Sequence, residues 1–332
     1  MEQLFSNFSI ILLLIIFILS LFLLTKSADW LVEEAVQIAG SFGVSEIIIG
    51  ATIVSLGTTL PEVATSIISI IQKSSELALG NAVGSIITNM TFILGIGALS
   101  GSLPVFRNVA RSFSFFALIS LLFMGMSFIK NGSHSFQLGG NLSMSFGWVL
   151  LVALPIYIFF SFRKTKVEKS KKNTKKVKKK DVMFSFMKII GSAILVAFAA
   201  TVLVSSVKVG ATRIGVPETI IASTVVAFGT SLPELTTIIT ATRKGYGSLA
   251  VGNIIGANIL NLLLVLGLSI AISPTGIMVP AVYYSLGFPV LLLVLLLFGF
   301  FVFNTKIREI SKKEGILLLL VYVVYLFLNT VR

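Results

Sequence analysis

The sequence lacks cysteine altogether and has a single histidine. The absence of cysteine excludes disulfide bonds, thiolate metal sites and cysteine nucleophiles. The one histidine, His134, lies in a polar stretch between apolar segments, NGSHSFQ, where we expect an exposed loop residue and not a ligand. Thiol chemistry is therefore excluded, and ligation by histidine is a poor explanation of this chain.

Charge is also scarce. Charged residues make up 12% of the 332 residues, whereas 56% are hydrophobic. A soluble globular chain has about 25% charged residues. Segments of about 20 predominantly apolar residues can span a bilayer, and this chain contains many of them. The composition therefore predicts an all-α polytopic membrane protein that has the lipid bilayer as its surroundings.

The net charge of +13 is concentrated in one place. Eleven of the 26 Lys and Arg residues lie between Arg163 and Lys180, in RKTKVEKSKKNTKKVKKK. A short basic run between two apolar segments is typical of a cytoplasmic loop that follows the positive-inside rule, and it is also suited to contact with anionic lipid headgroups. We therefore expect no nucleic-acid partner.

We predict ten membrane-spanning helices. The first apolar segment has no basic n-region and no cleavage site, so it is expected to remain as a helix, with an amphipathic continuation after it. The two halves of the chain, 1–162 and 183–332, are joined by a basic linker, 163–182. The predicted spans are 8–25, 45–72, 77–99, 110–129, 143–162, 183–209, 217–242, 248–272, 280–303 and 315–330.

Charge in the loops sets the orientation of these spans. If the run 163–180 is cytoplasmic, both termini lie outside, and 21 of the Lys and Arg residues fall on the inner side against 5 on the outer side. This asymmetry agrees with the positive-inside rule. We predict a multi-pass protein of the plasma membrane.

The chain contains an internal repeat. With an offset of 172 residues, 52–95 aligns without gaps to 224–267, with 18 identities in 44 positions. Five predicted spans separate the two copies, which we place at about 45–99 and 217–272, so the copies face opposite sides of the membrane. Inverted repeats with interrupted helices at matching positions are typical of secondary transporters.

The repeat carries two glutamates near the middle of predicted spans, Glu62 in GTTLPE and Glu234 in GTSLPE. An ionised carboxylate at mid-bilayer costs roughly 2.5–3.5 kcal/mol on insertion scales, so such groups usually pair, line water or bind a cation. Proton sharing within a purely structural pair is the alternative. Because the whole neighbourhood repeats, we favour a cation site.

The residues around each glutamate suit a hard cation. Pro61 and Pro233 interrupt the helical hydrogen bonds and free carbonyls about one turn back, around Thr58 and Thr230. We expect Gly57 and Gly229 to permit local unwinding. Each hexapeptide thus offers a carboxylate, hydroxyls and bare carbonyls, which is the all-oxygen ligand set that Ca²⁺ prefers.

The next helix of each copy adds polar side chains at four-residue steps. Asn81, Ser85 and Asn89 form one stripe. Its mate consists of Asn253, Ala257 and Asn261, with Asn258 beside it. Glycines nearby are expected to let helices approach closely, namely Gly80, Gly84, Gly252 and Gly256. Some hydroxyls along the first copy are expected only to bond back to their own helix, among Thr52, Ser55, Thr59, Ser66 and Ser69.

GTTLPE followed by GNAVGSIITN, and GTSLPE followed by GNIIGANILN, resemble the two α-repeats of the cation/calcium exchanger superfamily, and prokaryotic sodium/calcium exchangers most of all. The resemblance covers both repeats, the span count and the basic central loop. It implies ten helices in two inverted five-helix halves and four ion sites at mid-membrane.

The resemblance also implies roles for individual residues. Calcium would be held by Glu62, Glu234, Thr58 and Thr230. Sodium would be held by the two glutamates together with Ser55, Thr59, Ser85, Asn89, Ala227, Ser231 and Asn261. Supporting positions would be Gly57, Pro61, Asn81, Gly229, Pro233, Asn253 and Asn258.

Two positions depart from the pattern of the cation/calcium exchanger superfamily. Members that exchange sodium often have an aspartate where Asn261 stands and a serine where Ala257 stands. The site then holds two carboxylates and not three, and one peripheral sodium site loses a hydroxyl. Both changes bear on the number of sodium ions exchanged.

The expected function is antiport of Ca²⁺ against Na⁺ by alternating access, with calcium extrusion, no bound cofactor and no enzymatic activity. Bare carboxylates are costly to move through a low-dielectric barrier, whereas a cation neutralises them. Exchange of Ca²⁺, or of another divalent cation, against protons remains an alternative. A cation channel built from carboxylate rings is a further one. An intramembrane protease is disfavoured, since the chain has no GxGD motif. We expect the chain to work as a monomer.

Overall fold

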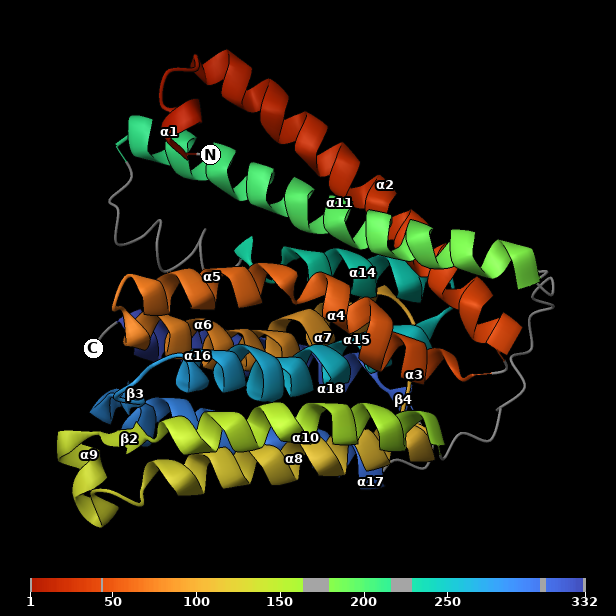
Figure 1. Cartoon of the computed structure of the whole chain (residues 1–332). Coiled ribbons are helices and arrows are strands. Elements are labelled where there is room, and N and C mark those ends of the chain that lie inside the picture. The colour runs from red at the N-terminus through yellow and green to blue at the C-terminus, as the bar shows by residue number, and fades with distance from the viewer. Residues whose placement is uncertain (1, 43, 164–178, 216–228, 305–308, 331–332) are drawn as a thin grey trace.

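The computed structural model describes residues 2–42, 44–163, 179–215, 229–304 and 309–330, and most of these residues are helical (Figure 1). In the first half the elements are α1 Glu2–Phe5, α2 Ile10–Phe42, α3 Glu46–Ile49, η1 Gly50–Val54, α4 Ser55–Thr58, α5 Leu60–Ile71, α6 Ser75–Thr88, η2 Asn89–Ile93, α7 Leu94–Ser100, β1 Leu103–Pro104, α8 Arg107–Ser127, η3 Gly132–His134, α9 Ser135–Leu138, β2 Gly140–Leu142 and α10 Met144–Arg163.

The second half continues with α11 Lys179–Arg213, α14 Leu232–Arg243, α15 Gly247–Leu260, η5 Asn261–Leu266, α16 Gly267–Ala271, β3 Ile277–Val279, η6 Tyr283–Gly287, α17 Phe288–Asn304, β4 Glu309–Ile310 and α18 Lys312–Thr330. Four of the elements labelled η are π-helical turns, and η3 is a 3₁₀ turn. Helices occupy the predicted spans wherever the structure describes them, with ends that differ by a few residues. The amphipathic continuation of the first span is confirmed, because α2 runs on to Phe42.

Within the described residues, seven helices are long and apolar enough to cross a membrane. An eighth span results if the bent pair Glu46–Thr58 and Leu60–Ile71 is counted as one. Large apolar side chains on the periphery are exposed, for example Phe22 and Phe300, as a lipid-facing surface requires. The chain is thus a largely helical membrane protein, and the count of ten spans stays a prediction.

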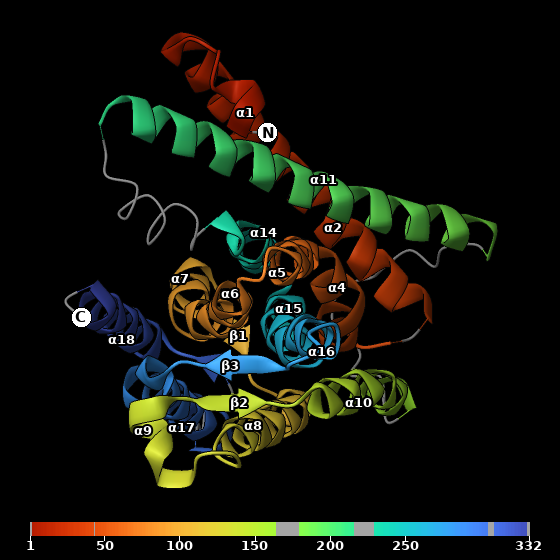
Figure 2. The same cartoon turned by 60° about the vertical axis from the view of Figure 1, so that its left-hand side comes forward.

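The helices form three layers. One layer consists of α2 and α11, which pack along each other and cross over the rest of the bundle (Figures 1 and 2). The middle layer contains α3 to α7 together with α14, α15 and α16. The third layer contains α8, α10 and α17, and α18 packs beside α7 and η2 at the edge of the middle layer. The middle layer is the most buried, since α15 exposes almost none of its side chains.

The repeat seen in the sequence is also a repeat of elements. Adding 172 to the bounds of α5 and α6 gives the bounds of α14 and α15. The same offset takes Asn89, where η2 begins, to Asn261, where η5 begins. A two-stranded pair, β1 with β4, lies at one end of the bundle and a second pair, β2 with β3, lies at the other end (Figure 1). Two copies of one unit in opposite orientations would give this arrangement.

Two predicted close approaches are confirmed. A methyl group on Gly252 would lie 2.3 Å from the carbonyl oxygen of Ile47, and one on Gly256 would lie 2.5 Å from the Cα atom of Ala51. The small residues therefore let α15 pack directly on the backbone of α3 and η1. The same expectation is wrong for Gly84, whose added methyl group would meet nothing within 4 Å. Gly84 instead borders a cavity.

Candidate functional site

The helix of the first hexapeptide is broken where the sequence predicts. Helix α4 ends at Thr58, Thr59 has φ −83° and ψ −1°, and α5 begins at Leu60 with Pro61 in its first turn. The two parts meet at a bend of 45°. Proline suits this position, because the first N–H groups of a helix have no intrahelical acceptor. The break places Glu62 in the first turn of α5.

The second hexapeptide has the same local structure. Helix α14 begins at Leu232 after Ser231, which has φ −90° and ψ 5°, and Pro233 again lies in the first turn. Glu234 follows it, as Glu62 follows Pro61. Residues 216–228 lie outside the described residues, so the predicted sodium ligand Ala227 is not placed.

The predicted role of the two glycines is wrong. Gly57 lies inside α4 and Gly229 is also helical, and neither has a positive φ. Both glycines face α11 instead. A methyl group would lie 2.4 Å from the Cβ atom of Ala193 at Gly57 and 2.4 Å from Cγ2 of Val204 at Gly229. The missing side chain at each position lets the backbone lie close to α11.

The two glutamates come together in the middle layer. Glu62 is 0% exposed and Glu234 is 1% exposed. They lie close enough for their charges to repel each other. No Lys, Arg or His side chain is buried among the described residues, and neither glutamate makes an ion pair there. Two acids thus share a buried site that contains no cationic side chain.

Many polar atoms around this pair lack a hydrogen-bond partner among the described residues. Both carboxylate oxygens of each glutamate are in this state, and so are the side-chain oxygens of Thr59, Asn89, Ser231, Thr237 and Asn261. A buried polar group without a partner costs roughly 1–3 kcal/mol, and more if it is charged. Carboxylate, hydroxyl and amide oxygens gathered without donors suit a hard cation such as Ca²⁺.

Four asparagines connect the elements around the site. Asn81 Nδ2 donates to the carbonyl of Glu62 at 3.0 Å and to Ser66 Oγ at 2.9 Å, so it braces α5. Asn89 Nδ2 donates to Asn258 Oδ1 at 3.0 Å, which joins the two repeats. The hydroxyl of Thr58 donates to Asn253 Oδ1 at 3.4 Å. The amides therefore position the site, and the free Oδ1 of Asn89 still points to a ligand role.

Other predicted residues lie in the same region. Ser85 and Thr230 lie on the wall of one cavity. Thr52, Ser55 and Ser69 donate their hydroxyls to carbonyls of their own helix, as expected for some of this group. These contacts leave the oxygen lone pairs of Ser55 available to a cation. Ala257 is fully buried and offers no oxygen.

Sequence reasoning missed Thr237. It is fully buried, and its hydroxyl has no partner among the described residues. It follows Glu234 by three residues on α14, so it shares a helix face with the carboxylate. That spacing is the signal that could have revealed it. Within the described ranges, no three His, Cys, Asp or Glu side chains lie close enough together to hold a metal ion.

A cavity of about 510 Å³ reaches the site from one end of the bundle. Glu76 and Asn329 line it near that end, and Asn81, Ser85 and Thr230 line it deeper. Its wall comes from α5, α6, η6 and α18. The orientation predicted from the loop charges puts this end on the outer side. The cavity thus connects predicted site residues to this end of the bundle.

Comparison with known proteins places these features in a family. The family model for "Sodium/calcium exchanger protein" matches residues 12–163 and 184–331. Sodium/calcium exchanger MaX1 of Methanosarcina acetivorans is 30% identical, over 94% of this chain and 97% of its own. Inner membrane protein YrbG of Escherichia coli is 34% identical, over 85% of this chain and 86% of its own.

Solved structures show the same fold. A structure of the sodium-calcium exchanger NCX_Mj, soaked with Na⁺ and without Ca²⁺, superposes with a TM-score of 0.80 at 30% identity, over 95% of this chain and 98% of that one. The family model, the relatives and the fold agree over nearly the whole length. The chain belongs to the sodium/calcium exchanger protein family.

Proposed function

We propose that this protein exchanges Ca²⁺ for Na⁺ across the cell membrane by alternating access, with Glu62 and Glu234 as the shared ion ligands. One observation carries the proposal. Two carboxylates that make no ion pair with a described residue lie buried at matched positions of the repeat, just after the breaks at Thr59 and Ser231. Inward sodium gradients would drive calcium outward, so the physiological direction is extrusion.

Within this proposal, the ligands of calcium are the two glutamates and the carbonyls of Thr58 and Thr230. Sodium is held by the glutamates with Thr59, Ser85, Asn89, Ser231 and Asn261, and Thr237 joins this group. Ca²⁺ or two Na⁺ cancels the charge of −2, so the loaded site crosses the low-dielectric barrier and the bare site does not.

Calcium-45 uptake into proteoliposomes tests the exchange. Vesicles loaded with sodium and diluted into sodium-free medium are expected to take up calcium, and uptake should saturate. An imposed proton gradient without sodium should drive little uptake. Uptake driven only by protons would replace sodium exchange with the proton alternative. Flux that does not depend on any counter-ion would favour a channel.

The number of sodium ions exchanged follows from two side chains. With Asn261 and Ala257 in place, the site has two carboxylates and lacks one hydroxyl. Two sodium ions leave the site neutral, whereas three leave a charge of +1 that is costly to bury. We therefore expect exchange of two Na⁺ for one Ca²⁺, which moves no net charge.

A potassium diffusion potential checks this expectation. Sodium-driven calcium uptake by the wild type should not change when valinomycin sets the potential. The double variant Ala257→Ser, Asn261→Asp should become sensitive to the potential, because it regains a hydroxyl and a carboxylate for a third ion. A wild type whose uptake changes several-fold with the potential would contradict the two-sodium account.

Ion pairs at the predicted inner end hold α2 and α11 together and join α2 to the middle layer. Lys188 of α11 pairs with Glu34 of α2 at 2.7 Å, so these two helices are tied together. Lys244, which follows α14, pairs with Asp29 at 2.9 Å and Glu33 at 2.8 Å, both on α2. The second group joins α2 to the helices that carry the site. The ion pairs of Lys244 must therefore break if α2 and α11 move over the middle layer.

Lys244 stays charged over the physiological pH range. Its partial burial lowers its pKa, but hydrogen bonds to Glu33 and Asp29 raise it more, so the pKa lies above the ordinary value. A raised lysine pKa stabilises the paired state below that value, and the contribution is lost only as pH rises through it. Between pH 6 and 9, roughly, the pairing should therefore not vary with protonation of Lys244.

We predict that Lys244→Gln shifts the protein away from the state with an open outer cavity. Partly exposed ion pairs contribute up to about 1 kcal/mol each, so the population should shift about three- to tenfold. The chain has no cysteine, so Leu286→Cys in the cavity wall gives a clean reporter. Its labelling rate from outside should fall in Lys244→Gln and stay unchanged in Lys313→Gln, an exposed lysine of α18. Equal rates in both variants would refute this role.

A further inference from the structure

The cavity that leads to the ion site is larger than an inorganic ion requires. Its volume is about 510 Å³, which falls in the range of roughly 300–1,000 Å³ that is usual for sites of small organic molecules. Two glycines of α6 contribute to this width. A methyl group on Gly80 would lie 3.3 Å from the Tyr283 hydroxyl, and one on Gly84 would meet nothing within 4 Å. The cavity therefore has room for an organic ligand between its mouth and the ion site.

Three tyrosines line this cavity. Tyr283 belongs to η6, and Tyr322 and Tyr325 belong to α18. The ring centroids of Tyr322 and Tyr325 are 6.4 Å apart, and Tyr283 lies close enough to Tyr325 to interact with it electrostatically. Tyr322 is held by a ring contact with Phe92, at 5.3 Å between centroids, and by a side-chain hydrogen bond with Thr88. The fold thus fixes a cluster of aromatic rings at the cavity wall.

The charge of the cavity wall is negative. Glu76, in the first turn of α6, is the only charged side chain among the described residues that line the cavity. It makes no ion pair with a described residue, and it lies close enough to Tyr283 for an electrostatic interaction. Leu77, Leu286 and Leu326 add apolar surface. Rings, apolar side chains and one carboxylate together suit a cation with an organic body.

The aromatic cluster favours one class of organic cation. The faces of aromatic rings attract cations, and clusters of such rings recognise quaternary ammonium groups in particular. A primary ammonium group carries three N–H donors that need acceptors, whereas Glu76 is the only carboxylate of the wall and is exposed at the mouth. A quaternary ammonium group has no N–H donor, so it requires only the rings and a nearby negative charge.

We propose that the outer cavity binds quaternary ammonium ions between its three tyrosines, with Glu76 as the counter-charge. Choline is the simplest biological example of this chemistry. A bound quaternary ammonium ion occupies the route from the mouth of the cavity to the ion site, so it excludes Ca²⁺ without taking the place of Ca²⁺ at the two glutamates. The block of transport rests on the function proposed above, whereas binding to the cavity does not.

Equilibrium dialysis of the full chain in detergent with carbon-14 choline, in buffer free of sodium and calcium, tests the site. The competitor is 3,3-dimethylbutan-1-ol, which has the shape of choline but no charge. We expect one choline per chain, and the neutral alcohol should compete at least about tenfold less well than unlabelled choline. Tyr283→Leu should weaken choline binding about tenfold, whereas Tyr283→Phe keeps the ring and should bind choline as the wild type does. Glu76→Gln, a change at an exposed position that should not affect folding, should weaken it about threefold.

Two further measurements separate this site from the ion site. The variant Glu62→Gln, Glu234→Gln should bind choline as the wild type does, because choline lies outside the pair of glutamates. In sodium-loaded proteoliposomes, external choline should raise the calcium concentration that gives half-maximal uptake and leave the maximal rate unchanged.

Three results would overturn the proposal. Equal competition by the neutral alcohol and by unlabelled choline would exclude recognition of the positive charge. Wild-type affinity in both Tyr283→Leu and Glu76→Gln would place choline elsewhere on the protein. Loss of choline binding in the double glutamine variant would show that choline occupies the ion site itself.

Discussion

Replacing either glutamate of the pair by glutamine is expected to reduce sodium-driven calcium uptake at least about 100-fold. Glu62 and Glu234 are the only buried carboxylates within the middle layer of the described structure, and neither makes an ion pair with a described residue. In the calcium-bound site the opposite charges are the cation and the carboxylates, and removal of one partner from such a buried ion pair costs about 3–5 kcal/mol. At about 1.4 kcal/mol per tenfold change in affinity, calcium should no longer bind at working concentrations.

A control variant tests whether uptake is lost because the site is changed or because any carboxylate has been removed. Glu309→Gln changes a partly buried glutamate of β4, and glutamine can still accept the hydrogen bond that Ser102 donates at 2.6 Å. Its uptake should equal that of the wild type. Glu62→Gln should stay folded, because it removes an uncompensated charge. Its Tm should therefore not fall in cation-free buffer and should respond little to added calcium. Full transport by Glu62→Gln would remove this residue from the site.

A single methyl group on Gly57 is expected to reduce transport at least tenfold. The added carbon would lie 2.4 Å from the Cβ atom of Ala193, so α4 and α11 would have to separate. Overpacking of this kind costs about 1–3 kcal/mol. Because α11 also packs along α2, the displacement should disturb the movement of both helices over the site. Calcium uptake of Gly57→Ala provides the measurement.

A compensating change makes this test specific. In the double variant Gly57→Ala, Ala193→Gly, the nearest atom to the new methyl group is the Cα atom of residue 193 at 3.6 Å, an ordinary contact. Most of the uptake should return. A small loss should remain, because the new glycine at position 193 destabilises α11 by about 1 kcal/mol relative to alanine. Gly191→Ala, two residues away on α11, meets nothing within 4 Å and should be silent. An unimpaired Gly57→Ala, or a double variant that stays inactive, would contradict the packing account.

The local chemistry of the site was predictable because it depends on short continuous segments of the sequence. Proline and its neighbours in GTTLPE specify a helix break, and the offset of 172 residues predicts the same break in GTSLPE. The structure confirms both breaks at Thr59 and Ser231. Burial of Glu62 and Glu234 followed from their position within apolar runs. These features depend on hydrogen bonding along one chain segment and on the cost of charge in lipid.

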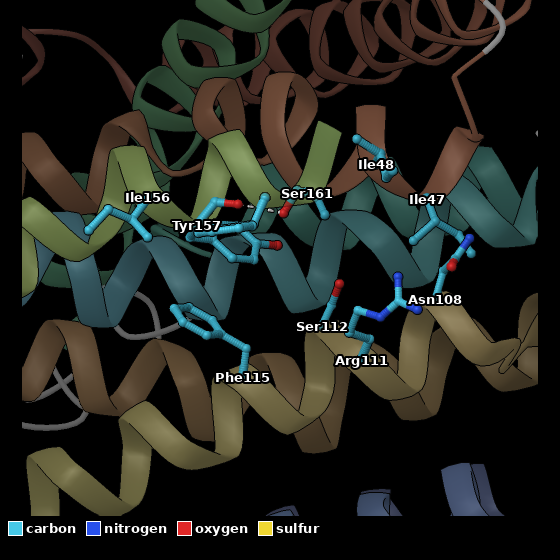
Figure 3. Close-up of a pocket in the computed structure, with 11 residues that line it drawn as sticks. Ile47, Ile48, Asn108, Arg111, Ser112, Phe115, Ile156, Tyr157 and Ser161 are labelled. Carbon is cyan, nitrogen blue, oxygen red and sulfur yellow. Dashed lines mark hydrogen bonds between the residues drawn. The ribbon is translucent and has the colours of Figure 1, made fainter. Parts of the chain in front are cut away.

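Features that depend on contacts between distant helices were not predictable from the sequence. The partners of Gly57 and Gly229 on α11 are set by helix packing, so the expected unwinding role was wrong. Gly84 has the same place in the repeat as Gly256, but an added methyl group there would contact no other atom within 4 Å. A pocket around Arg111 joins residues from three distant segments (Figure 3). Nor do the π-helical turns at Asn89 and Asn261 follow from residue preferences, since tertiary packing decides between helix types.

Equilibrium binding of calcium-45 to the purified protein, with sodium as competitor, tests the shared site most directly. The account predicts one calcium per chain, displaced by sodium with a Hill coefficient of about 2 and lost in the variant Glu62→Gln, Glu234→Gln. Lithium or potassium at the same ionic strength should displace much less. Calcium binding that persists in saturating sodium, or that survives in the double glutamine variant, would contradict the claim that both ions use this pair of glutamates.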